Sequence, residues 1–213
     1  MGVTAPPVTV QGVQLNRGEA MTAVLGLAVG AFVGVTFDEH TVRPPAHTDG
    51  LWILLVVVVS ARHTMIRGIL RGAGALLLGV LAFFAGRQIR LMLAPAWGFP
   101  PRVHAVDLAF WCLVGFVAGV FLGVIACWIG RPGWLPSAAA AFPMALILTD
   151  AYHWYERNSQ VPPMALAAVV IIAVLGHRSW RQIGLTGVLL IPGIVAGCLL
   201  TPLLDPAHQV LPL

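Results

Sequence analysis

Charged residues are scarce in this sequence of 213 amino acids, and lysine is absent altogether. Aspartate, glutamate and arginine together make up 9% of the chain, whereas a water-soluble domain carries about a quarter. Hydrophobic residues make up 59%. Because an ionised group in hydrocarbon costs several kcal/mol, the charge-poor stretches are predicted to lie in a lipid bilayer.

Other absences exclude several classes of function. The sequence contains no Walker loop, no dinucleotide fingerprint and no nucleophile elbow. The arginines are spread through short loops and form no cluster that would indicate nucleic-acid binding. Cys112, Cys127 and Cys198 lie inside apolar runs without a CxxC pair, so we expect packing roles and no disulfide framework. No segment has the close ligand spacing of a metal site, and neither a metal nor a cofactor is expected.

Seven apolar runs follow one another along the chain, separated by short polar segments. They cover residues 21–37, 51–66, 68–86, 108–129, 135–154, 163–176 and 183–204. A helix needs about 20 apolar residues to cross the hydrocarbon core, so the second and sixth runs are short for a full span. The runs predict an all-α fold, an integral membrane helical bundle with six or seven transmembrane helices in residues 19–205. Residues 1–18 are expected to form a disordered cytoplasmic tail, and residues 206–213 a short C-terminal tail.

The distribution of charge predicts an orientation. With seven spans alternating from a cytoplasmic N-terminus, seven of the twelve arginines lie inside, in the direction of the positive-inside rule. Every acidic residue except Glu19 then lies outside or near the outer rim. We therefore expect a multi-pass protein of the cell membrane, with the lipid bilayer as its surroundings.

Glycines recur at every fourth position in the first and fourth runs. They are Gly26, Gly30 and Gly34 in GLAVGAFVG, and Gly115, Gly119 and Gly123 in GFVAGVFLG. Such stripes let helix backbones approach closely, so we interpret them as packing surfaces within the chain, or toward a second copy or a membrane partner. The stripes also resemble an internal repeat. A second similarity, between His63-x3-Arg67 and His177-x3-Arg181, implies a different offset, and we interpret both as coincidences.

The segment DAYHWYE at the end of the fifth run holds the strongest candidates for chemistry. Asp150, His153 and Glu156 are spaced three residues apart, which places them within about a third of a helix circumference. In a bundle interior, such a row relays protons or lines a substrate pathway. A functional Asp150 is expected to face the interior, hydrogen-bonded to His153 or to an arginine. The alternative is that the helix ends near Asp150 and all three side chains are hydrated.

Several segments resemble one family of small, uncharacterised membrane proteins from actinobacteria. They are WILLVVVVSARH, RGAGALLLGVLAFFAG, FWCLVGFVAGVFLGVIACWIGRPGW and the acidic position Asp150. The resemblance covers about residues 23–150. It implies a polytopic architecture and a bacterial inner membrane, and it implies no activity.

Three classes of function are compatible with these patterns. The first is a small transporter or permease-like protein with Asp150 in a polar cavity, and we rank it first. The second is a membrane-embedded enzyme acting on a lipid or isoprenoid, with Asp150 or His153 as general acid or base. The third is a non-catalytic subunit that binds a partner through its glycine-rich helix faces. A cavity at Asp150 open to water favours transport, one open to lipid favours the enzyme, and an exposed glycine stripe favours the subunit.

Overall fold

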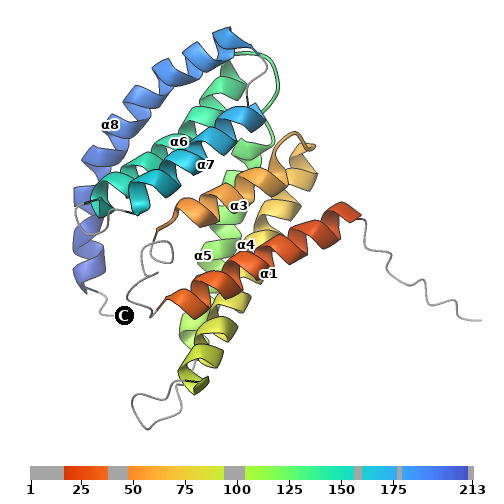
Figure 1. Cartoon of the computed structure of the whole chain (residues 1–213), viewed down its shortest axis with the longest axis vertical. Helices are drawn as coiled ribbons and strands as arrows, with labels where there is room; N and C mark the ends of the chain where they lie inside the picture. Colours follow the sequence, from red (N-terminus) through yellow and green to blue (C-terminus); the bar gives the residue numbers. More distant parts are fainter. Residues whose placement is uncertain (1–16, 38–47, 94–103, 156–159, 177–178, 211–213) are drawn as a thin grey trace, which may run out of the picture.

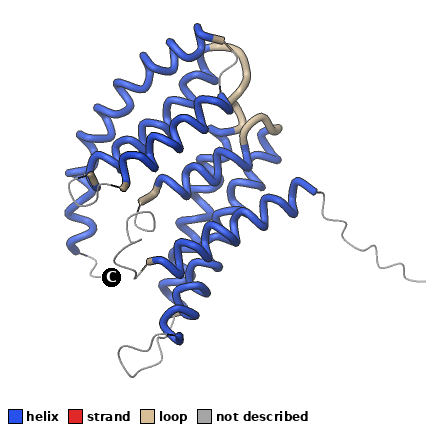
Figure 2. The backbone as a smooth tube through the Cα atoms, viewed as in Figure 1, coloured by secondary structure: helices blue, strands red, loops and turns tan. Residues whose placement is uncertain are grey.

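The computed structural model describes residues 17–37, 48–93, 104–155, 160–176 and 179–210, with side chains up to residue 199. Within these ranges the chain forms seven α-helices and no strand (Figure 1, Figure 2). The helices are α1 (Arg17–Thr36), α3 (Gly50–Ser60), α4 (Met65–Leu93), α5 (Ala105–Ala126), α6 (Trp134–Trp154), α7 (Val161–Gly176) and α8 (Trp180–Val210). The predicted all-α class is confirmed.

Five of the described helices, α1, α4, α5, α6 and α8, are long and apolar enough to cross a membrane. Helices α3 and α7 have only 11 and 16 residues. At 1.5 Å per residue they measure about 16 and 24 Å, against a hydrocarbon core of about 30 Å. The two short helices coincide with the two runs that were expected to be short.

The boundary between α3 and α4 differs from the predicted one. A turn at residues 61–64 divides the expected run 51–66, and Arg62 there has a left-handed backbone with a φ of 63°. Helix α4 then starts at Met65 and continues beyond residue 86 to Leu93. The added segment contains Arg87 and Arg90, which are good helix formers with side chains long enough to reach an interface.

Glycines determine which helices of the first half are neighbours. A Cβ added to Gly26 would lie 2.6 Å from the carbonyl oxygen of Ala75. One added to Gly119 would lie 2.6 Å from the Cα of Ala73. The successive glycine contacts make α1 parallel to α4 and α5 antiparallel to α4. Both pairs come close because no side chain separates their backbones.

The second half repeats the order of helix lengths found in the first. Helices α6 and α8 are parallel, with Gly193 opposite Ala145 and Gly197 opposite Thr149. Thus α1–α3–α4 and α6–α7–α8 both run long, short, long, with the first and third helices parallel, and α5 connects them. Helices α1 and α8 lie on opposite outer sides of the bundle (Figure 1).

This arrangement gives one of the two sequence similarities a structural counterpart. His63 and Arg67 lie where α3 turns into α4, and Arg181 lies where α7 turns into α8. These turns occupy equivalent places in the two three-helix units. His177, the remaining member of the pattern, lies outside the described residues. Arg67 and Arg181 therefore lie near equivalent turns of the two units.

The buried core is built around the two short helices. Val56 of α3, Ile147 of α6 and Ile172 of α7 are at most 1% exposed. The outward faces of α5 and α8 carry exposed apolar side chains such as Phe116 and Val188. An apolar exterior of this kind is suited to contact with lipid.

The two ends of the bundle differ in charge. We call the end where α1, α4, α6 and α8 begin the basic end; its arginines are Arg17, Arg62, Arg67, Arg71, Arg131 and Arg181. We call the opposite end the acidic end; its described charged residues are Asp49, Arg87, Arg90, Asp107 and Asp150. Candidate sites of different chemistry therefore lie at the two ends.

Candidate functional site

Asp150 joins two helices at the acidic end. It is half-buried in the last turns of α6, and its Oδ2 accepts a hydrogen bond from the backbone N–H of Asp49 at 2.9 Å. The backbone N–H of Gly50 lies close enough to interact electrostatically with this carboxylate. These two amides open α3, so a side chain from α6 caps the N-terminus of α3.

The chemistry of a helix start explains this contact. The first amides of a helix have no partner within the helix, and the dipole places partial positive charge on them. Asp49 occupies the N-cap position of α3 but makes no side-chain capping hydrogen bond. The carboxylate of Asp150, 101 residues further along the chain, supplies the acceptor.

Asp49 is a member of this site that the sequence reasoning did not include. Its exposed side chain lies close enough to Asp150 for the two negative charges to interact. The Asp49–Gly50 pair directly before an apolar run is a recognisable helix-start signal. That signal identifies the start of α3, but it does not reveal which distant residue meets it.

Of the other two predicted site residues, the structure describes His153 but not Glu156. His153 is exposed, and its Nδ1 lies 2.8 Å from the backbone oxygen of Thr149, to which it donates. His153 is near enough to Asp150 to interact electrostatically, but the hydrogen bonds of Asp150 go to the start of α3. The expected partner, His153 or an arginine, is thus replaced by backbone amides, because an uncapped helix start offers two donors. Glu156 lies outside the described residues.

A second polar group lies in the interior beside Asp150. The hydroxyl of Thr149 is buried and has no hydrogen-bond partner among the described residues. It faces Gly197 of α8, where an added Cβ would lie 3.2 Å from the Thr149 Cβ. The end of α6 therefore places a carboxylate toward α3 and an unsatisfied hydroxyl toward α8.

The glycine stripes lie at contacts within the chain. Gly26, Gly30 and Gly34 of α1 meet Ala75, Gly79 and Phe83 of α4. Gly115, Gly119 and Gly123 of α5 meet Val80, Ala73 and Gly68 on a neighbouring face of α4. Both stripes are covered by α4, and neither is open to a partner. In α8, by contrast, Gly184 and Gly187 have no atom within 4 Å of an added Cβ.

An apolar groove of about 280 Å³ lies between α5 and α6. Its lining residues are Val124, Ile125, Trp128, Leu135, Ala138, Ala139 and Phe142. None of these side chains is a general acid or base at neutral pH. Among the residues that the structure describes, no three His, Cys, Asp or Glu side chains are placed to hold a metal ion.

The basic end is held together by arginines that donate to neutral acceptors. Arg71 donates to Nε2 of His63, which is therefore an acceptor with its hydrogen on Nδ1. Arg131 donates to the His63 carbonyl oxygen at 3.2 Å, and Arg62 to that of Leu175 at 2.8 Å. Burial and the positive charges of Arg71 and Arg67 lower the pKa of His63 below its ordinary value. This cluster connects α4 to the α5–α6 loop and to the end of α7.

No protein-family model, no curated protein and no solved structure matches the chain.

Proposed function

We propose that this chain is a small permease-like integral membrane protein in which Asp150 and the start of α3 form a proton-responsive site. The observation that carries the proposal is the hydrogen bond from the Asp49 backbone to the Asp150 carboxylate. Proposed with it is a cell-membrane location with a cytoplasmic N-terminus, since the basic end then faces the cytoplasm as the positive-inside rule requires.

The length of α3 supports a role in transport. With 11 residues it is too short to cross a bilayer, and its start contacts the end of α6 through Asp150. Short helices whose N-termini point into a bundle bind anionic substrate groups in many transporters. In this chain the carboxylate of Asp150 already occupies that position.

Protonation gives the site a means of switching. A proton on Asp150 removes the negative charge that the two amides of α3 bind, and the cap weakens. The start of α3 then becomes available to an external anion, such as a small carboxylate or phosphate. Uptake of the proton and of the anion at one place would couple their movements, and the buried Thr149 hydroxyl adds a further polar group at this level.

Electrophysiology on a solid-supported membrane tests this proposal with the full chain in proteoliposomes. The probes are small carboxylates and inorganic phosphate, with sugars and amines for comparison, under an imposed pH gradient. We expect anions to evoke a current that D150N reduces by about tenfold or more, equivalent to at least ~1.4 kcal/mol. Asp107 in the first turn of α5 provides the matched control, because it also lies at the acidic end.

The control variant and the refuting results are defined in advance. D107N should keep the current within about twofold of the unmodified protein, a difference below ~0.5 kcal/mol. Equal currents in D150N and the unmodified protein, or no current with any anion, would contradict the proposal. Size-exclusion chromatography checks that D150N is folded; asparagine keeps a side-chain acceptor for the α3 amides.

A specific observation favours a second candidate, a partner-binding subunit. In the most apolar 18-residue stretch of α8, within Trp180–Leu199, only 6% of the residues are buried. No atom lies within 4 Å of a Cβ added at Gly184 or Gly187. A partner helix or a second copy could approach the backbone there. Crosslinking through a cysteine introduced at Gly187, in a variant without the native cysteines, tests this: a specific crosslinked product supports the subunit, and its absence opposes it. The enzyme alternative gains no support from the lateral groove, whose lining lacks acid–base groups.

A further inference from the structure

The basic end carries more positive charge than its own carboxylates balance. Six described arginines lie there, namely Arg17, Arg62, Arg67, Arg71, Arg131 and Arg181, and Glu19 is the acidic residue described with them. The acceptors of Arg62, Arg71 and Arg131 are backbone carbonyls and a neutral imidazole. These hydrogen bonds hold the arginines in place without neutralising them. An anion from outside the chain is the natural complement of such a face.

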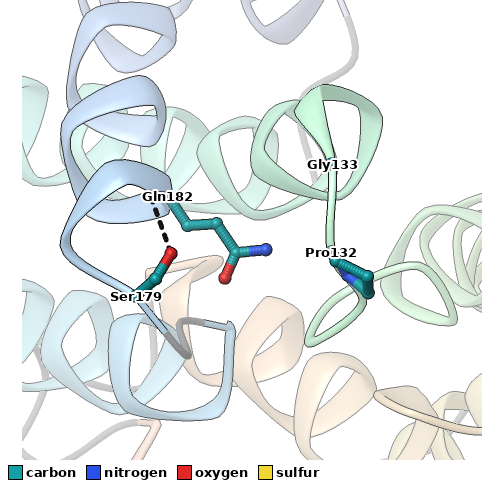
Figure 3. Close-up of a pocket in the computed structure, with 4 residues that line it drawn as sticks. All are labelled: Pro132, Gly133, Ser179 and Gln182. Carbon is teal, nitrogen blue, oxygen red and sulfur yellow. Dashed lines mark hydrogen bonds between the residues drawn. The ribbon is translucent and has the colours of Figure 1, made fainter.

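A cavity of about 330 Å³ opens within this charged end. Its lining residues are Pro132 and Gly133 before α6, and Ser179 and Gln182 at the start of α8 (Figure 3). Ligand pockets usually measure about 300–1,000 Å³, so the cavity has room for a headgroup-sized ligand. Arg131 and Arg181 are the chain neighbours of lining residues. The Arg131 guanidinium lies at the His63 carbonyl oxygen and over the Trp128 ring, and the Arg181 side chain is exposed.

Hydrogen bonds hold two of the lining residues in place. The side chain of Gln182 extends from α8 toward Pro132 (Figure 3). Its Nε2 donates to the backbone oxygen of Arg131 at 2.9 Å, so α8 is tied to the loop before α6. The Ser179 hydroxyl oxygen accepts a hydrogen bond from the Gln182 backbone N–H at 3.4 Å. The hydroxyl hydrogen of Ser179 can then point to an anionic oxygen.

Two tryptophans indicate the depth of the cavity in the membrane. Trp134 and Trp180 begin α6 and α8, and they are 68% and 87% exposed. Indole rings prefer the headgroup level of a bilayer. Just below them, the exposed Leu135 and Ile183 continue the two helices with apolar surface. The cavity, the tryptophans and the apolar surface follow one another along α6 and α8. A ligand with a charged headgroup in the cavity and hydrocarbon chains along the two helices fits this order.

We propose that the cavity between Pro132–Gly133 and Ser179–Gln182 binds the phosphate headgroup of an anionic phospholipid. Arg131 and Arg181 supply the positive charge, Ser179 and Gln182 supply hydrogen bonds, and the acyl chains lie along the apolar faces of α6 and α8. The site is at the opposite end from Asp150, so it is independent of the permease proposal.

Binding of defined lipids to the full chain tests this site. The purified protein is titrated with phosphatidylglycerol and with phosphatidylcholine, and bound lipid is counted by native mass spectrometry. We expect phosphatidylglycerol to bind about tenfold more tightly, and the R181Q and S179A variants to reduce that preference about fivefold or more. The matched control is R90Q, which removes one arginine from the acidic end and should change the preference less than about twofold.

Each further outcome decides between sources of the anion. Free inorganic phosphate that displaces the lipid at low millimolar concentration would assign the cavity to a soluble anion and overturn the lipid proposal. Equal binding of the two lipids, or an equal loss in R90Q and R181Q, would also overturn it. Arg131 is left unchanged because it also donates to the His63 carbonyl oxygen. The side chain of Arg181 is exposed, so we expect its replacement to leave the fold intact.

Discussion

The close approach of α4 and α5 predicts the cost of a single added methyl group. In a Gly119→Ala variant the new Cβ lies 2.6 Å from the Ala73 Cα, whereas ordinary contact begins at 3.4 Å. The backbones must separate by about 0.8 Å (3.4 − 2.6), and gaps of about 0.5–1 Å remove a quarter to a half of the dispersion energy of the affected contacts. Overpacking costs about 1–3 kcal/mol, and the higher helix propensity of alanine returns up to about 1 kcal/mol. Subtracting that gain from the overpacking cost, we expect G119A to lower the free energy of unfolding by up to ~2 kcal/mol.

Gly184 supplies the matched control for this experiment. It has no atom within 4 Å of an added Cβ, so G184A makes the same chemical change without a clash. Its stability should equal that of the unmodified protein or exceed it by up to about 1 kcal/mol. Unfolding is followed by tryptophan fluorescence as sodium dodecyl sulfate is titrated into mild-detergent micelles. Equal midpoints for G119A and G184A would refute the packing of α5 on α4 at Gly119.

Two further predictions concern the polar ends. D150N should lower the free energy of unfolding by about 1–3 kcal/mol, because the α3 amides lose a charged acceptor. D107N should change it by less than about 0.5 kcal/mol. The same detergent titration measures both variants, and equal effects would contradict the capping of α3 by Asp150. Stability should also fall as the pH drops below about 6.5, because the lowered pKa of His63 lets the unfolded chain take up the proton first. An H63Q variant cannot titrate there but can still accept from Arg71, so its pH dependence between 7.5 and 5.5 should be flatter; an unchanged slope would exclude His63 as the cause.

The helical bundle could be predicted from hydropathy, but its neighbour relations could not. The apolar runs identified every helix in the described part of the chain, including the two short ones. Their order in space was not accessible, because lipid-facing and protein-facing side chains are equally apolar. The stripe at Gly26, Gly30 and Gly34 predicted a close contact without indicating that α4 is the partner. The same helix, α4, covers both glycine stripes, and the sequence around either stripe does not show this.

Of the candidate site, the sequence predicted one residue, Asp150, and not its partners. Asp150 stood out as an acidic residue at the end of an apolar run, and it does contact another helix. Its partners are backbone amides at positions 49 and 50, and backbone groups leave no signature of their distant contacts in a sequence. The cavity at the basic end was missed for a related reason. Its residues come from two segments, one before α6 and one at the start of α8, which are separated by 46 positions from Gly133 to Ser179, and neither segment carries a recognisable motif.

The link between Asp49 and Asp150 also sets an order of events during biosynthesis. At a translation rate of about 5–20 residues per second, the ribosome needs about 5–20 s to advance the 101 positions from Asp49 to Asp150. During that interval α3 is present without its cap, while α4, α5 and α6 are being made. Until Asp150 has been made, the start of α3 lacks the carboxylate that caps it in the finished protein. A chain terminated before α6 should accordingly be a substrate for membrane proteolysis.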